Sequence, residues 1–168
     1  MGARLRRFRP GDAAALAAVL GDAEVMRHSD AGPLGPEAIA RWLHRACAPA
    51  PADRGYWAVR DPAGGCVGYA HLTETPGLVA PGDLEIGLRL SRAAQGRGIG
   101  RAVVEALCSR AAEDGGSTRV LAVVDPDNLP SRRLFARAGF HEAGRLMLPG
   151  YDHPDLVLAR DLLSSSGR

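Results

Sequence analysis

The feature that most constrains this chain is a glycine-rich segment, Gln95–Gly100, which stands between two regular patterns. Before it, Asp83–Leu90 alternates apolar and polar side chains, and this alternation predicts a β-strand. After it, apolar residues recur at helical spacing from Ile99 onward. The glycines are therefore expected in a loop that leads directly from a strand into the first turn of a helix.

A loop of this kind is suited to binding a phosphate group. Glycines leave backbone N–H groups open to an anion because they have no Cβ atom. The helix N-terminus adds unpaired N–H groups and the positive end of the helix dipole. Arg97 and Arg101 flank the loop and can add charge-assisted hydrogen bonds. The alternative is that the glycines only form a tight strand-to-helix turn.

Two common phosphate-binding loops do not fit these residues. The dinucleotide fingerprint requires a third glycine, at a position that Arg101 or Val103 occupies. A Walker A loop requires a lysine, and all 21 basic residues of this chain are arginines. The pattern that remains is Q/R-x-x-G-x-G/A, formed here by Gln95, Gly98 and Gly100.

Length and composition indicate one ordinary globular domain. The 168 residues are expected to form a single domain, 1–168, with a folded core over 4–163 and a disordered tail over 164–168. A net charge of +2 argues against a nucleic-acid partner. No signal peptide or membrane-spanning segment is recognised, so we expect a soluble, cytoplasmic protein with no membrane partner. The three cysteines are expected to be buried apolar residues.

The remaining patterns predict an alternating series of strands and helices. In chain order these are a strand over 4–8, a helix over 13–20, a short helical piece over 24–28, a helix over 36–46, strands over 56–60, 66–72 and 83–90, a helix from 99 to near 115, a strand over 119–124, a helix over 131–138, and strands over 143–148 and 156–163. This order predicts an α+β domain with one mixed sheet.

The glycine loop resembles the pyrophosphate-binding loop of the GNAT superfamily of acyl-CoA N-acyltransferases. A second segment, Asn128–Phe140, resembles the superfamily pattern N-x-x-[AS]-x-x-L-[YF]-x-x-x-G-F. A third, Glu85–Leu88, resembles the E-I-G-Y strand of the RimJ/RimL-like branch, whose members acetylate ribosomal-protein N-termini and related amines. The resemblance covers roughly residues 4–163 and implies the GNAT fold, in which helices flank a single mixed central sheet.

The resemblance also implies a site for acetyl-CoA in a split between the strands 83–90 and 119–124. The pantetheine arm is expected to pair with the backbone of Leu88, Arg89 and Leu90. The pyrophosphate is expected on the loop residues Gln95, Gly96, Arg97, Gly98, Ile99, Gly100 and Arg101. Asn128 and Ser131 are expected beside the pantetheine, although an asparagine after a Pro–Asp pair is also a common turn residue.

The implied reaction is direct attack of an amine on the thioester. The amine must lose a proton, and Glu85 is the candidate base, acting directly or through water. The alternative is that Glu85 is a solvated residue on the polar face of a strand. A backbone N–H near Leu88–Leu90 is expected to hold the oxyanion. Many relatives protonate the leaving thiolate with a tyrosine where this chain has Phe135, so Tyr151, water or an unprotonated thiolate must substitute.

The acceptor is expected to be a small-molecule amine or a peptide N-terminus, and a homodimer through an edge strand is left open. His71 and His153 could line the acceptor side, but single histidines at such spacings are more often structural, and the sequence predicts no metal site. The rival hypothesis is a catalytically degenerate acyl-CoA-binding sensor or scaffold of the same fold. Intact loop residues support both, whereas Glu85 favours the enzyme and Phe135 favours the rival.

Overall fold

The structure is a computed structural model that describes residues 4–29, 31–52, 54–75, 77–78, 80–113, 116–150 and 152–162. Tyr151 and the predicted C-terminal tail lie outside these residues. In chain order the elements are β1 (Arg4–Arg6), the 3-10 turn η1 (Pro10–Asp12), α1 (Ala13–Leu20), α2 (Ala23–Met26), α3 (Pro36–Ala46), β2 (Gly55–Arg60), β3 (Cys66–Thr73), β4 (Asp83–Leu90), the 3-10 turn η2 (Arg92–Ala94), α4 (Ile99–Glu113), β5 (Arg119–Val124), α5 (Leu129–Arg137), β6 (His141–Leu146) and β7 (Asp155–Asp161). Within the described ranges, no helix has the length and apolar character needed to cross a membrane.

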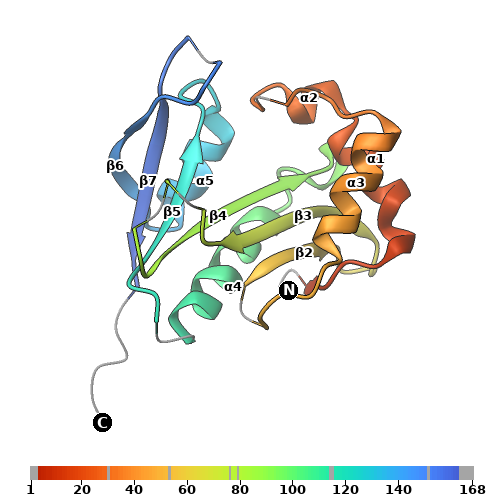
Figure 1. Cartoon of the computed structure of the whole chain (residues 1–168), viewed down its shortest axis with the longest axis horizontal. Helices are drawn as coiled ribbons and strands as arrows, with labels where there is room; N and C mark the ends of the chain where they lie inside the picture. The colour runs from red at the N-terminus through yellow and green to blue at the C-terminus, as the bar shows by residue number, and fades with distance from the viewer. Residues whose placement is uncertain are drawn as a thin grey trace.

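The strands form one seven-stranded sheet in the order β1-β2-β3-β4-β5-β7-β6 (Figure 1). Every neighbouring pair is antiparallel except β4 and β5, which run parallel with α4 as their crossover. The α+β class and the single mixed sheet predicted from the sequence are confirmed.

Helices cover the two faces of this sheet and enclose two apolar cores. On one face, α1 and α3 pack on β2 and β3, and Leu16, Val19 and Leu20 of α1 are almost fully buried there. On the other face, α4 packs on β3 and β4 through Val103 and Leu107 (Figure 1). The burial of one stripe on each helix is what the helical spacing of apolar residues predicts.

The parallel strands β4 and β5 pair only over their first three residues. The paired residues of β4 are Asp83, Leu84 and Glu85, which lie opposite residues 119–121 of β5. Within the described chain, the rest of β4 has no ladder partner on its β5 side. The strands then diverge, as Figure 1 shows. At the closed end, Arg119 donates to the buried Asp83 carboxylate from Nη2 at 2.6 Å and from Nε at 3.1 Å. The sheet is therefore split where the sequence analysis expected the pantetheine arm.

Several predicted boundaries were wrong by two or more residues. The first strand ends at Arg6 rather than residue 8, because Phe8 turns into the apolar core under α1 and α3. Strand β6 covers 141–146 rather than 143–148, because Gly139, with φ of 81°, reverses the chain immediately after α5. The expectation of three buried cysteines was also wrong, since Cys108 is buried but Cys66 is half-buried and Cys47 is exposed.

Candidate functional site

The glycine loop lies between the end of β4 and the start of α4, as predicted. Gly96 and Gly98 have φ of 71° and 77°, a backbone conformation that side chains disfavour. A Cβ atom at either position would have no other atom within 4 Å, so the loop backbone faces open space. The Gln95 side chain donates from Nε2 to the Leu90 carbonyl at 3.0 Å and so ties the loop to the strand.

The beginning of α4, the end of β4 and helix α5 converge at Gly100. A Cβ atom there would lie 3.3 Å from Leu134 of α5 and 3.6 Å from Leu88 of β4. The third glycine of the motif therefore permits close packing of these elements, whereas Gly96 and Gly98 shape the loop. This packing brings the first turn of α4 against Leu88 of β4 and Leu134 of α5.

Asn128 rather than Ser131 begins helix α5. Its Oδ1 accepts a hydrogen bond from the Ser131 backbone N–H at 3.1 Å, which is N-terminal capping geometry. The predicted start of this helix at residue 131 was wrong, since the helix begins at Leu129 and Ser131 already lies inside its first turn. The capping bond uses Oδ1, so the Asn128 amide N–H₂ takes no part in it, and the expected contact of Asn128 with pantetheine stays a prediction.

Glu85 lies on the sheet face that α1 and α3 partly cover, beside the closed end of the split. Its Oε2 accepts a hydrogen bond from Thr75 Oγ1, and its Oε1 lies 3.8 Å from Nε2 of His71. Burial would raise the pKa of the Glu85 carboxyl, but the contacts with His71 and Thr75 outweigh it and lower that pKa overall. The Glu85 side chain is therefore an ionised carboxylate that its neighbours keep in place, and not a freely solvated group.

His71 lies next to Glu85 because of the register of β3 and β4. The ladder sets Thr73 opposite Glu85 and His71 opposite Gly87, so these positions share one face. The His71 ring stands over Gly87, where a Cβ atom would lie 2.3 Å from its Cε1. Its other side packs on the Tyr56 ring of β2 with centroids 5.3 Å apart. His71 is thus fixed beside the carboxylate, and whether it lines an acceptor side stays a prediction.

The structure offers no acid at position 135. The Phe135 ring is 3% exposed and packs against Phe140 with centroids 5.0 Å apart. Tyr151, the predicted substitute, lies outside the described residues, so its role stays a prediction.

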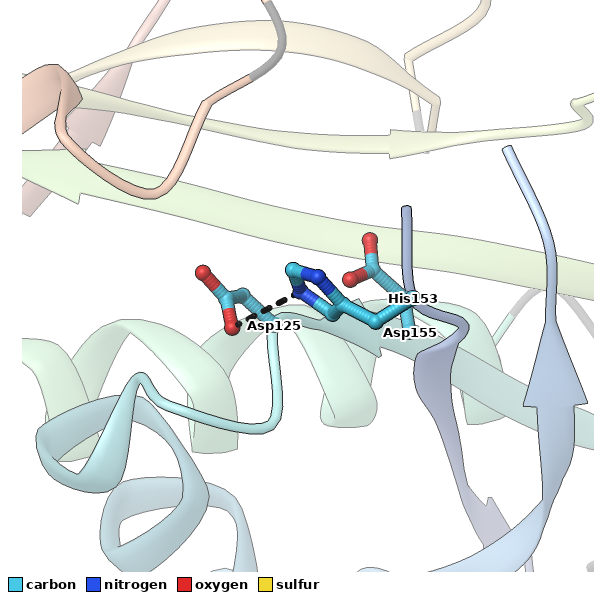
Figure 2. Close-up of side chains that lie close together, drawn as sticks. All are labelled: Asp125, His153 and Asp155. Atoms are coloured by element: carbon cyan, nitrogen blue, oxygen red, sulfur yellow. Dashed lines mark ion pairs between the residues drawn. The ribbon is translucent and has the colours of Figure 1, made fainter. Parts of the chain in front are cut away.

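A second polar cluster lies where β5 ends and β7 begins. Figure 2 shows Asp125, which follows β5, with its carboxylate turned toward the His153 ring, and Asp155 at the start of β7 beside them. The Oδ1 of Asp125 lies 3.6 Å from His153 Nε2. On its other side, Oδ2 of Asp125 lies 2.5 Å from Nδ1 of His28, which follows α2. This cluster connects three segments that are far apart in the sequence.

Contacts between the Asp125 carboxylate and neighbouring histidines hold this cluster together within the described chain. Burial would raise the pKa of the Asp125 carboxyl, but hydrogen bonds from the Asp127 backbone N–H and from His28, with the nearby His153, lower it overall. Donor atoms of Asp125, His153 and Asp155 lie within 4.8 Å of one another, so this set also has the composition of a cation site. No spacing pattern in the sequence indicates this set, because its members come from separate strands and loops.

Comparisons with known proteins identify the fold. The family model of the acetyltransferase (GNAT) domain matches residues 3–141. A comparison with curated protein sequences gave no match. Among solved structures, an acetyltransferase (GNAT family) from Bacillus anthracis superposes with a TM-score of 0.82 at 19% identity, covering 96% of this chain and 95% of that chain.

Two further structures have bound ligands named with them. The aminoglycoside acetyltransferase AAC(6')-Ib in complex with coenzyme A superposes with a TM-score of 0.79 at 20% identity, covering 95% of this chain and 94% of that chain. The spermidine N-acetyltransferase from Vibrio cholerae in complex with CoA and spermine superposes with a TM-score of 0.79 at 15% identity, covering 97% of each chain. At these identities the similarity shows a shared fold.

Proposed function

Because this chain belongs to the GNAT acetyltransferase family, we propose that it transfers an acetyl group from acetyl-CoA to a primary amine. The observation that carries the proposal is the split between β4 and β5, with the glycine loop at its open end. Leu88, Arg89 and Leu90 pair with β3 on one side, but in the described chain no ladder partner lies on their β5 side, and backbone groups that face that side are suited to the pantetheine arm. Loop residues 95–101 and the α4 N-terminus are suited to the pyrophosphate.

The reaction requires no covalent intermediate with the protein. The amine nitrogen forms a bond to the thioester carbon as the C–S bond breaks, and the electron pair leaves with the CoA sulfur. The nitrogen loses one proton, for which Glu85 is the nearest described carboxylate on the acceptor face. A backbone N–H of 88–90 stabilises the oxyanion. With Phe135 buried, the thiolate leaves unprotonated or takes a proton from water, which is feasible because thiols ionise near pH 8.5.

The acceptor is a small-molecule amine or a peptide N-terminus. Solved proteins of this fold include acetyltransferases named for aminoglycosides and for spermidine, which supports an amine acceptor for this chain. The strand Glu85–Leu88 supports membership of the RimJ/RimL-like branch, where peptide N-termini are acceptors. For either class, the proposal is that the reacting amine lies beside Glu85.

The test is acetyl-CoA binding by calorimetry, followed by thioester consumption with a panel of amines. The double variant Arg97→Glu, Arg101→Glu reverses two exposed charges at the loop and should weaken binding roughly 10- to 100-fold. The matched control Arg41→Glu reverses an exposed charge on α3 and should leave binding unchanged. Failure of the folded wild-type protein to bind acetyl-CoA would overturn the cofactor assignment.

A second candidate function is an acyl-CoA-binding sensor or scaffold. It is favoured by the apolar, buried Phe135 in place of the tyrosine that many relatives use as an acid. Tight acetyl-CoA binding with no turnover of any amine, unchanged in Glu85→Gln, would establish this alternative and exclude the enzyme.

A further inference from the structure

His71 is a half-buried titratable residue for which the proposed function has no role. Its side chain is 17% exposed, and its Nδ1 atom is closed off from water with no hydrogen-bond partner among the described residues. A buried polar atom without a partner costs free energy, so its retention calls for an explanation. The explanation offered here rests on the proposed acetyl transfer and concerns the fate of the amine proton.

A proton is all that the contact between His71 and Glu85 needs in order to become a hydrogen bond. Nε2 and Oε1 are 3.8 Å apart, which is too long for a hydrogen bond yet leaves no room for an intervening side chain. The other carboxylate oxygen is already occupied by Thr75. Two lone pairs that face each other at this distance are expected when the imidazole carries its proton on Nδ1. A proton placed between Nε2 and Oε1 would turn this contact into a charge-assisted hydrogen bond.

We propose that His71 is a positioning residue that receives, through Glu85, the proton released by the attacking amine. The nitrogen loses its proton to Oε1 of Glu85 as the C–N bond forms, and the proton is then shared with Nε2 of His71. Glu85 is thereby restored as a carboxylate beside an imidazolium. The proton returns to water after the products leave.

The relative basicity of the two groups favours this direction. An imidazole is a stronger base than a carboxylate, so a proton taken up by Glu85 moves downhill to a neutral histidine.

The surroundings of the pair keep the proton between the two residues. Tyr56 of β2 packs on the His71 ring. Burial is the main cause that raises the pKa of the Tyr56 phenol, so the phenol stays neutral. Arg45 at the end of α3 is the cation that interacts with Tyr56. On the strand side, Gly87 presents no side chain to the ring. In the described chain, Glu85 is the one carboxylate paired with His71.

The first experiment needs no turnover. Nitrogen-15 NMR of the wild-type protein, well above pH 7, should show His71 as the neutral tautomer with its proton on Nδ1. A tautomer with the proton on Nε2 would overturn the proposal, because Nε2 would then already donate to Glu85 and could not accept a proton. This result is independent of whether any amine is acetylated, so it separates this proposal from the proposed function.

The second experiment compares kcat of wild type and His71→Gln from about pH 5.5 to 8.5, with one saturating acceptor. Ionisation of the acceptor cancels in the ratio of the two kcat values. We expect a ratio of roughly 10 to 100 at high pH that falls toward about 1 as His71 is protonated, with unchanged acetyl-CoA affinity.

A ratio that is constant across this range would assign His71 a merely structural role, and a ratio of about 1 throughout would assign it none. Either result overturns the proposal. His141→Gln, an exposed histidine on β6, is the matched control and should give no change. If His71→Gln fails to fold, His71→Asn provides the same comparison, and the tautomer measurement on the wild type still decides.

Discussion

At the scale of single residues, the site depends on how each oxygen of one carboxylate is held. Thr75 binds one oxygen of Glu85, and His71 lies beside the other. The hydrogen bond from Thr75 and a positive charge on His71 each favour the ionised form, and together they outweigh the burial that opposes it. A carboxylate restrained on two sides keeps one orientation toward the split, which is what a base needs in order to meet an amine at a fixed place.

Replacing Glu85 with glutamine should impair catalysis without impairing cofactor binding. The amide retains the shape of the side chain but cannot accept the amine proton, so we expect kcat to fall at least about 100-fold. The acetyl-CoA affinity measured by calorimetry should stay within about twofold, since the predicted pyrophosphate site is remote. Glu142→Gln, at an exposed position on β6, serves as the control. Full activity in Glu85→Gln would remove Glu85 from the mechanism.

Replacing Gly87 with alanine tests how closely His71 is packed on β4. The new Cβ would lie 2.3 Å from Cε1 of His71, so the ring must move. We expect a loss of stability of about 1–3 kcal/mol in urea denaturation, from overpacking. In a His71→Ala background the same substitution should cost much less, because the obstructing ring is gone. Equal costs in both backgrounds would show that the two residues are not coupled.

At the scale of elements, short polar contacts fix where segments begin and end. Asn128 caps α5, and its position sets the orientation of the helix N-terminus toward the split. At the other end of the chain, Arg6 of β1 forms two hydrogen bonds, of 2.7 and 2.6 Å, with the carboxylate of Asp12 in η1. These contacts hold elements that bury little apolar surface of their own.

Asn128→Asp should separate the two roles of that residue. Aspartate caps a helix as well as asparagine does, so the free energy of unfolding should change by less than about 0.5 kcal/mol. The substitution replaces the amide N–H₂ with a negative oxygen, so acetyl-CoA should bind more weakly in calorimetry if Asn128 faces the pantetheine. Asn128→Ala should instead cost about 1 kcal/mol of stability. Unchanged affinity in Asn128→Asp would restrict Asn128 to capping.

Asp12→Asn should reveal a pH-dependent contribution to stability. The hydrogen bonds from Arg6 lower the pKa of Asp12 below its unfolded value of about 3.9, although burial opposes this shift. The stabilisation is therefore complete above about pH 5 and is lost as the pH falls through the lowered folded value. We expect a cost of roughly 2–4 kcal/mol at pH 7 that shrinks below about pH 4, measured by urea denaturation.

The control for this measurement is Glu37→Gln, which removes an exposed ion pair with Arg41 on α3. Exposed pairs contribute little, so this variant should change stability by less than about 0.5 kcal/mol at any pH. A cost of Asp12→Asn that persisted at low pH would show that packing, and not charge, holds β1 to η1.

At the scale of the whole molecule, the sheet consists of two antiparallel parts that meet in one short parallel contact. Strands β1–β4 form one part and β5, β7 and β6 the other, and three residue pairs join them at the closed end of the split. Helix α4 and the core beneath it hold the two parts together on one face. A ligand between β4 and β5 would add contacts where the protein itself has few.

Acetyl-CoA should therefore stabilise the protein as a whole. At a ligand concentration 100 times the Kd, linkage predicts about 2.7 kcal/mol of added stability. For a chain of this size that corresponds to a rise in Tm of roughly 5–10 °C in calorimetry or dye-binding unfolding. Desulfo-CoA should act similarly, since it retains the pyrophosphate and pantetheine. A Tm independent of acetyl-CoA would contradict the cofactor assignment.

Local signals made the strand, the glycine loop and the helix beside the split predictable from the sequence. The alternation over Asp83–Leu90, the loop Gln95–Gly100 and the helical spacing after Ile99 are each readable within a few residues. The start of α5 was misplaced because Asn128 and Ser131 are both good capping residues, and only the position of Pro130 in the first turn favours the earlier one.

The acceptor side was less predictable because register and tertiary contacts determine it. The proximity of His71 and Glu85 follows from a ladder in which Thr73 faces Glu85, and the long connection between β3 and β4 does not set that register. The contact of Asp125 with His28 and His153 joins three distant segments, for which no local pattern exists. These polar residues can be identified in the sequence, but the sequence does not show which of them lie next to one another in the fold.

The split sheet separates two sets of groups that can change independently during evolution. The donor side is built largely from backbone groups and glycines, whose chemistry does not depend on side-chain identity. The proposed acceptor side is built instead from side chains, among them His71 of β3, Thr75 in the connection that follows it, and Glu85 of β4. Under the proposed function, descendants of such a chain can exchange one amine for another by changing a few of these side chains, while the proposed donor side and the core beneath it remain untouched.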